Sequence, residues 1–200
     1  METIKYITEK YNLDINQKEP IRIHISRWKE FPMLLNELGI KKAVEIGTYK
    51  GNFAEVLSIL IPGIDLTVVD AWKVYKDYKD YGENDLETIA YEQTLERSKK
   101  FGFKIIKDWS TEAAKQFEDE SLDFVFIDGN HDFEHVVEDI GVWSKKVKKG
   151  GIVSGHDFFK NHYKNFGVFE AVPAWCAAKD ISPLFVVAHD KCPSWFYVKQ

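Results

Sequence analysis

Cysteine is scarce in this chain, and long apolar runs are absent. The two cysteines, Cys176 and Cys192, lie outside any C-x-x-C pair, which excludes a zinc-binding signature and a disulfide framework. No apolar run approaches the roughly 20 residues that a membrane span needs. The first residues also lack the apolar stretch and small-residue cleavage site of a secretory signal. We therefore expect a cytoplasmic protein with reduced thiols and no membrane partner.

A surplus of basic charge is missing too. The chain has 27 Lys and Arg residues against 32 Asp and Glu residues, which gives a net charge of −5. This balance argues against a broad electrostatic surface for nucleic acid. The basic stretch 145–149 is better explained as the solvated end of a helix, where cations suit the helix dipole.

Repeats and low-complexity linkers are also absent, and an alternation of short β-branched runs with helical patterns takes their place. Strands are predicted at residues 42–46, 66–70, 104–106, 122–128 and 151–154. Asn52–Leu60 has its apolar residues at helical spacing, and Pro62 with Gly63 ends this helix. The alternation predicts βαβ units and a parallel sheet. With 44% apolar residues the chain can fill one core, so we expect a single domain over residues 1–200.

Both ends of the chain depart from this alternation. After the fifth predicted strand, a helix is predicted at Val168–Ala178, followed by strands at 184–187 and 195–198. Because only a short polar loop separates these strands, they predict a hairpin in which one strand runs antiparallel. Residues 1–38 are predicted as a helical preface that covers one face of the sheet.

The first two strand ends carry a candidate ligand loop and a candidate ribose acid. Gly47 and Gly51 permit a tight turn and close approach of a ligand. The loop is not the G-x-G-x-x-G fingerprint, because Thr48 and Tyr49 occupy its interior, and this argues against a nicotinamide-dependent oxidoreductase. A wider loop suits a zwitterionic amino acid. Asp70 ends the next strand 23 residues after Gly47, near the spacing of roughly 20 at which an acid binds ribose hydroxyls.

The fourth and fifth strand ends each carry a carboxylate and a histidine. Asp128 is followed by His131, and His156 is followed by Asp157. Since the carboxyl ends of parallel strands meet at one edge, we expect these groups to lie together. They could bind a hard divalent ion through oxygen. Alternatively, His131 or His156 could remove a proton from an acceptor, because imidazole titrates near neutral pH.

Taken in order, these motifs resemble class I S-adenosylmethionine (SAM)-dependent methyltransferases. The resemblance runs from about Lys42 to the C-terminus and is closest to a bacterial subgroup distantly similar to catechol and metal-dependent sugar O-methyltransferases. It implies an α/β, Rossmann-like fold: a mostly parallel seven-stranded sheet with helices on both faces and a C-terminal antiparallel hairpin. Such relatives often form dimers, so the resemblance also implies a homodimer.

The resemblance also assigns roles to residues. The loop after the first strand would bind the methionine portion of SAM, Asp70 the ribose, and the next residues and the third strand end the adenine. The implied cofactor-binding residues are Glu45, Gly47, Thr48, Tyr49, Gly51, Asp70, Ala71, Trp72, Asp108, Trp109, Ser110 and Asp128. The implied catalytic residues are Asp128, His131 and His156. Asp128 and Asp157 match metal positions for Mg, Mn or Ca, although relatives carry Asp-Asn or Asp-Asp where this chain has His156-Asp157, which leaves metal dependence open.

Residues 72–100 form a further candidate element. Trp72 and several tyrosines (Tyr75, Tyr78, Tyr81 and Tyr91) alternate with charged residues here. The segment is either a lid whose rings stack on adenine or on a sugar, or an exposed helix with amphipathic tyrosines.

The function predicted from the sequence is methylation of a hydroxyl on a small, sugar-like acceptor. Two alternatives remain open: a non-catalytic binding module on a methyltransferase fold, and a methyltransferase that acts on an amine or on nucleic acid. The residues after Ile127 do not supply the Pro-Pro-aromatic element of amino-directed DNA methyltransferases, which disfavours the last of these.

Overall fold

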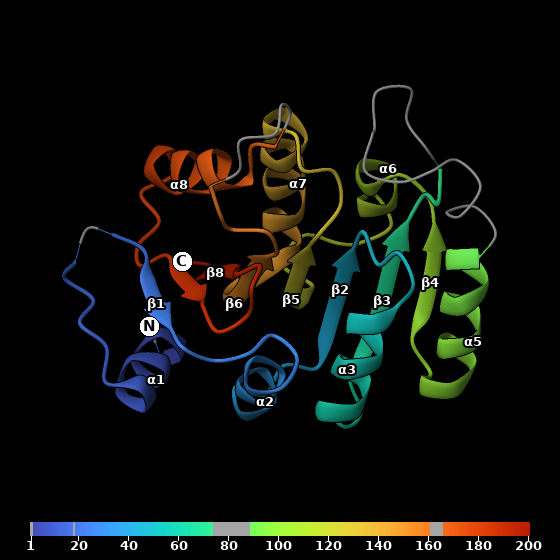
Figure 1. The fold of residues 1–200 in the computed structure, drawn as a ribbon, viewed down its shortest axis with the longest axis horizontal. Coiled ribbons are helices and arrows are strands. Elements are labelled where there is room, and N and C mark those ends of the chain that lie inside the picture. Colours follow the sequence, from blue (N-terminus) through green and yellow to red (C-terminus); the bar gives the residue numbers. More distant parts are fainter. Residues whose placement is uncertain (1, 18, 74–88, 161–165) are drawn as a thin grey trace.

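A computed structural model describes residues 2–17, 19–73, 89–160 and 166–200 (Figure 1). Within these ranges one sheet has the strand order β1-β7-β8-β6-β5-β2-β3-β4. The strands are β1 (Ile21–Ile23), β2 (Lys42–Ile46), β3 (Asp65–Asp70), β4 (Lys104–Lys107), β5 (Leu122–Ile127), β6 (Val147–Gly155), β7 (Phe185–Val187) and β8 (Ser194–Val198). The strand order reverses between β2 and β5, which places a topological switch point at the middle of the sheet.

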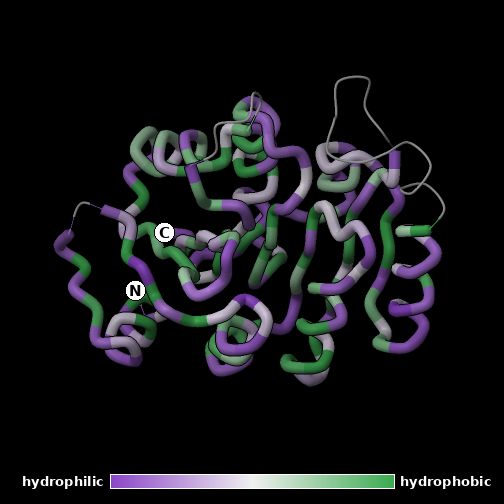
Figure 2. The backbone as a smooth tube through the Cα atoms, in the orientation of Figure 1, coloured by the Kyte–Doolittle hydropathy of each residue, from purple (hydrophilic) through white to green (hydrophobic). Residues whose placement is uncertain are grey.

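Helices cover both faces of this sheet (Figure 1). One face is covered by α1 (Glu2–Tyr11), α2 (Glu30–Glu37), α3 (Asn52–Leu60) and α5 (Tyr91–Phe101), and the other by α6 (Ser110–Ala114), α7 (Phe133–Lys146) and α8 (Val168–Ala178). Strand β5 is buried throughout: Phe124 and Phe126 enter the first core, and Val125 and Ile127 enter the second. Figure 2 shows hydrophobic and hydrophilic stretches alternating around the helices, as expected of helices with one buried side.

The predicted fold class is confirmed. β2 pairs in parallel with β3 and β5, and β8 runs antiparallel to both β6 and β7. The helices α3 and α8 have the predicted bounds. None of the helices in the described residues is long and apolar enough to cross a membrane.

The sheet has one strand more than the predicted seven, because residues 1–38 are not helical throughout. Ile21 and Ile23 are buried on either side of an exposed Arg22, and this period of two forms strand β1 between α1 and α2. β1 pairs in parallel with β7 at the edge of the sheet. Its carboxyl end therefore points to the same edge as the ends of β2 to β6.

Two further predictions need comment. The basic stretch 145–149 is divided, since α7 ends at Lys146 and Val147 already pairs with Leu122 as the start of β6. The predicted lid falls largely on residues 74–88, which lie outside the described residues. From Tyr91 the chain forms α5, and the ring of Tyr91 lies 4.8 Å from the ring of Trp72.

Candidate active site

A cavity of about 500 Å³ opens at the carboxyl ends of β2, β3, β4, β5 and β6, around the switch point. Binding sites of open α/β sheets are found at this position. Nearly all residues that the sequence singled out line it: Glu45, Gly47, Thr48, Tyr49, Asp70, Ala71, Trp72, Asp108, Trp109, Ser110, Asp128, His131, His156 and Asp157. The structure thus brings the candidates together, while their roles stay predictions.

Gly51 is the exception among the predicted residues. A Cβ built on it would approach the side chains of Phe103, Thr94 and Arg97, so this glycine packs toward α5 and does not line the cavity. Gly47 does line the cavity, and beside the expected tight turn the structure shows a further need for glycine at this position. With φ at +79°, its Cβ would lie 2.0 Å from the carbonyl oxygen of Asp128, so glycine is required by the close approach of the β5 backbone.

Asp70 connects two loops of the cavity. Its Oδ2 accepts a hydrogen bond from the Tyr49 amide at 2.9 Å, and its Oδ1 accepts one from the Trp72 amide at 2.7 Å. Burial raises the pKa of Asp70, although the hydrogen bonds from the two amides act to lower it. Each carboxylate oxygen has a second lone pair, so Asp70 can still accept bonds from a pair of hydroxyls. The indole of Trp72 is buried and donates to the Tyr49 carbonyl at 2.7 Å, so it supports the loop.

Three non-glycine residues on the cavity loops have left-handed backbones. The φ angles are +54° at Tyr49, +45° at Trp72 and +57° at Asp157. Such conformations cost about 1–3 kcal/mol each and persist where the surroundings fix them, commonly at functional sites. The loops after β2, β3 and β6 therefore each carry one strained residue at the cavity, while Asn12, Glu120 and Asp180 have similar backbones elsewhere.

The end of β4 meets an acid that the sequence did not reveal. The Ser110 hydroxyl donates to Asp139 of α7 at 2.5 Å, and the Trp143 indole donates to Ser110 at 2.8 Å. Burial raises the pKa of Asp139 to about 6. Asp139 was missed because it lies within helix α7, and in the sequence it does not follow a predicted strand.

Glu45 is a buried acid at the end of β2. Only 2% of it is exposed, and Thr48 is the neighbour that hydrogen-bonds to its carboxyl group. Burial, reinforced by the negative charge of Asp128, raises the pKa of Glu45 to about 8. At neutral pH its carboxyl group is therefore mostly protonated.

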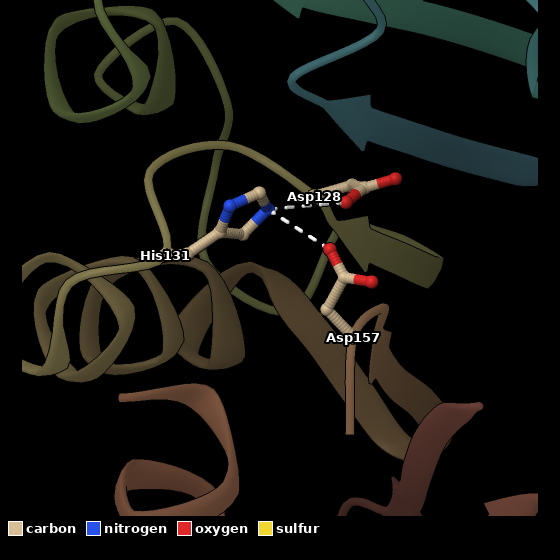
Figure 3. Close-up of side chains that lie close together, drawn as sticks. All are labelled: Asp128, His131 and Asp157. Carbon is tan, nitrogen blue, oxygen red and sulfur yellow. Dashed lines mark ion pairs between the residues drawn. The ribbon is translucent and has the colours of Figure 1, made fainter. Parts of the chain in front are cut away.

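The ends of β5 and β6 bring two carboxylates and two imidazoles together. The Nε2 atom of His131 lies 3.2 Å from Asp157 Oδ2 and 3.6 Å from Asp128 Oδ1 (Figure 3). The Nδ1 atom of His156 lies 3.1 Å from Asp157 Oδ1 and 3.5 Å from Asp128 Oδ1. Burial by itself would raise the pKa of Asp128, but bonds from both histidines and the charge of Arg27 lower it well below its ordinary value.

His156 has oxygen atoms at both ring nitrogens. Its Nε2 lies 3.1 Å from the Cys192 carbonyl, while Nδ1 faces the two carboxylates. Burial opposes a charged ring, yet Asp128 and Asp157 raise the pKa of His156 to about 9. His156 is therefore an imidazolium at neutral pH.

Arg27 completes this cluster and was missed from the sequence. It follows β1, and its Nη1 lies 3.4 Å from Asp128 Oδ2. The spacing of Ile21, Ile23 and Ile25 was the available signal, because a strand there would have put Arg27 at the same sheet edge as Asp128.

The comparisons with known proteins agree with this fold. A family model described as a methyltransferase domain matches residues 44–158. The uncharacterized protein y4gI of Sinorhizobium fredii is 26% identical over 142 residues, which cover 68% of this chain. This chain spans only 15% of that relative's length.

Solved structures share the fold at low sequence identity. A protein described as a caffeoyl-CoA O-methyltransferase from Staphylococcus aureus matches with a TM-score of 0.65 and 13% identity over 98% of this chain and 91% of its own. An O-methyltransferase from Bacillus cereus, in complex with SAH, has a TM-score of 0.63 and 15% identity over 99% and 89%. The O-methyltransferase TomG from Streptomyces achromogenes, in complex with SAM, has a TM-score of 0.59 and 13% identity over 100% and 91%.

Fold, switch-point cavity and strand-end motifs together define a class I methyltransferase. The family match covers more than half of the chain, and the chain belongs to this family of methyltransferase domains.

Proposed function

We propose that this chain is a SAM-dependent O-methyltransferase that acts on a small hydroxylated acceptor, with a sugar-like hydroxyl as the finer expectation. The observation that carries the proposal is one cavity lined by two chemically different sets of residues. Glu45, Gly47 and Asp70 come from the ends of β2 and β3, while Asp128 and His131 follow β5. The SAM and SAH complexes of TomG and the Bacillus cereus enzyme support the cofactor assignment.

The residues of the first set fit SAM chemically. The side chains of Glu45 and Thr48 are both buried, and Thr48 hydrogen-bonds to the Glu45 carboxyl group. An amino acid offers an ammonium group for the carboxyl of Glu45 and a carboxylate for the hydroxyl of Thr48. Asp70 would accept bonds from the ribose hydroxyls. Bound SAM would supply a methyl group on a sulfonium leaving group.

The chain's own task is then to align the acceptor and to remove its proton. We propose that His131 is the base that removes this proton. His156 is the weaker candidate, because its ring nitrogens face three oxygen atoms and its raised pKa keeps both nitrogens protonated. Asp128 and Asp157 both lie at the Nε2 atom of His131 and so orient its ring.

The same cluster fits a divalent cation. Asp128, His131 and Asp157 each offer one ligand atom, and these atoms lie within 4.8 Å of one another. Carboxylates suit Mg²⁺, Ca²⁺ and Mn²⁺, so Asp128 and Asp157 fit any of these ions, and His131 keeps its proposed role as the base. Asp128 and Asp157 would hold the ion, which would polarise the acceptor hydroxyl.

Turnover measurements test the reaction. Release of SAH from SAM is followed with catechol, a methyl glycoside and a primary amine as acceptors. His131→Ala should lower turnover with the hydroxylated acceptor at least ~100-fold, because general-base catalysis contributes that much. Its affinity for SAM, measured by calorimetry, should stay near that of the wild type. His24→Ala, an exposed histidine outside the cavity, is the matched control.

The alternatives give different results. Methylation of the amine alone would contradict the hydroxyl assignment. SAM binding without turnover on any acceptor would indicate a binding module. If His156→Ala loses turnover while His131→Ala does not, the base is His156.

A further inference from the structure

Arg27 has no part in the reaction as proposed so far, although its guanidinium lies in the cavity. It is 8% exposed, and its Nη1 contacts Asp128 Oδ2 at 3.4 Å. The guanidinium carbon lies 4.4 Å from the ring centre of Trp28, 5.4 Å from that of Phe53 and 5.8 Å from that of Phe126. Rings at these distances attract a planar cation and fix its orientation.

The backbone of Arg27 is held as firmly as its side chain. Asp190, in the loop between β7 and β8, accepts a bond from the Arg27 amide at 2.6 Å and one from the Ser26 hydroxyl at 2.9 Å. Strand β1 pairs with β7 immediately before this loop. Strand β1 and Asp190 together therefore hold Arg27 beside Asp128 in the cavity.

The charge of Arg27 reaches ionisable groups from both sets of residues that line the cavity. Burial is the largest influence on the pKa values of Glu45, Asp128 and His156, and the charge of Arg27 acts on all three. Its contact with Asp128 uses Oδ2, whereas both histidines lie nearest to Oδ1. Arg27 thus occupies one side of the Asp128 carboxylate and leaves the other side to the histidines.

We propose that Arg27 is a positioning residue of the methyl-transfer centre, which holds Asp128 through Oδ2 and offsets its negative charge beside the sulfonium of bound SAM. This inference rests on the proposed function, because it requires SAM in this cavity. Attraction that holds the ground-state sulfonium too firmly does not speed its reaction. By offsetting Asp128, Arg27 limits that attraction.

The affinities of SAM and SAH report this charge directly, because SAM carries the sulfonium charge and SAH does not. The calorimetry is done in buffer with EDTA, which removes divalent cations, so that the only charges in the empty cavity are those of the protein. Arg27→Met removes the cation, and we expect the preference for SAM over SAH to rise about tenfold. Arg27→Lys keeps the positive charge but not the planar stacking on Trp28, so its preference for SAM should rise by less than that of Arg27→Met.

Equal losses of SAM and SAH affinity in Arg27→Met would show a merely structural role, and an unchanged preference would also overturn the proposal. If Arg27→Met does not fold, Asp190→Ala serves instead. It keeps the Arg27 side chain but releases its backbone, and it should shift the preference in the same direction by less. Failure of the wild type to bind either ligand would instead refute the proposed function.

Discussion

At the scale of single residues, Glu45 and Asp128 show how neighbours decide the charge of a buried acid. Both line the same cavity. Asp128 has two histidines and Arg27 beside it, which outweigh its burial and lower its pKa. Glu45 is dominated by burial, and its pKa rises to about 8. Such divergence between nearby acids is typical of sites that handle charged ligands and protons.

Glu45 gives a pH prediction for the unliganded protein. Its pKa is near 4.5 when unfolded and about 8 when folded, so the unfolded chain binds fewer protons between these values and stability falls as pH rises through them. Glu45→Gln removes this loss, which amounts to a few kcal/mol when complete. Relative to the wild type, the variant should therefore gain stability from pH 5 to pH 8 in urea unfolding. Comparison with the wild type isolates Glu45 from His156, whose raised pKa also removes stability above pH 6.5.

The surface variant Glu118→Gln is the control, because Glu118 is exposed. Its stability should follow the wild type at every pH. Parallel pH curves for Glu45→Gln and the wild type would show that burial does not perturb this carboxyl group.

At the scale of elements, the chain's strands and helices differ in how far local pattern determines them. The bounds of α3 could be predicted because its apolar spacing is helical and Pro62 with Gly63 follows it. Strand β1 was missed, because the alternation of Ile21, Ile23 and Ile25 is short and its pairing partner β7 is about 160 residues away in sequence.

The same distinction explains the candidate site. Asp70, Asp128 and Asp157 could be predicted because each follows an apolar run, and parallel strands bring such ends to one edge. Arg27 and Asp139 could not, because their places depend on the pairing of β1 and on the packing of α7 against β5. Gly51 faces α5 and does not line the cavity, and sequence spacing alone does not show this.

The loop between β2 and α3 gives a prediction at this scale. Gly47→Ala combines a left-handed φ of +79° with a Cβ only 2.0 Å from the Asp128 carbonyl oxygen. We expect a loss of about 3 kcal/mol or more in the free energy of unfolding. Gly63→Ala has a similar φ of +76° but no atom within 4 Å, so it should lose only about 1 kcal/mol from backbone strain. Denaturant titration of both variants measures the difference, and equal losses would contradict the close approach of β2 and β5.

At the scale of the whole molecule, the fold gathers residues from distant parts of the chain at one sheet edge. Arg27, Asp128 and Asp157 come from three different loops, and each lines the same cavity. Arg27 follows strand β1, whose carboxyl end lies at the same edge of the sheet as that of β6. The homodimer, the single-domain organisation and the cytoplasmic location remain predictions from the sequence.

The most direct measurement of the central claim is a crystal structure of the protein grown with SAH and Mn²⁺. We predict SAH in the switch-point cavity, with its ribose hydroxyls on Asp70, its amino-acid end at Glu45 and Thr48, and Mn²⁺ between Asp128 and Asp157. SAH bound outside this cavity, or bound with its ribose away from Asp70, would contradict the account. Mn²⁺ absent from an otherwise occupied site would remove the cation and leave the methyltransferase assignment in place.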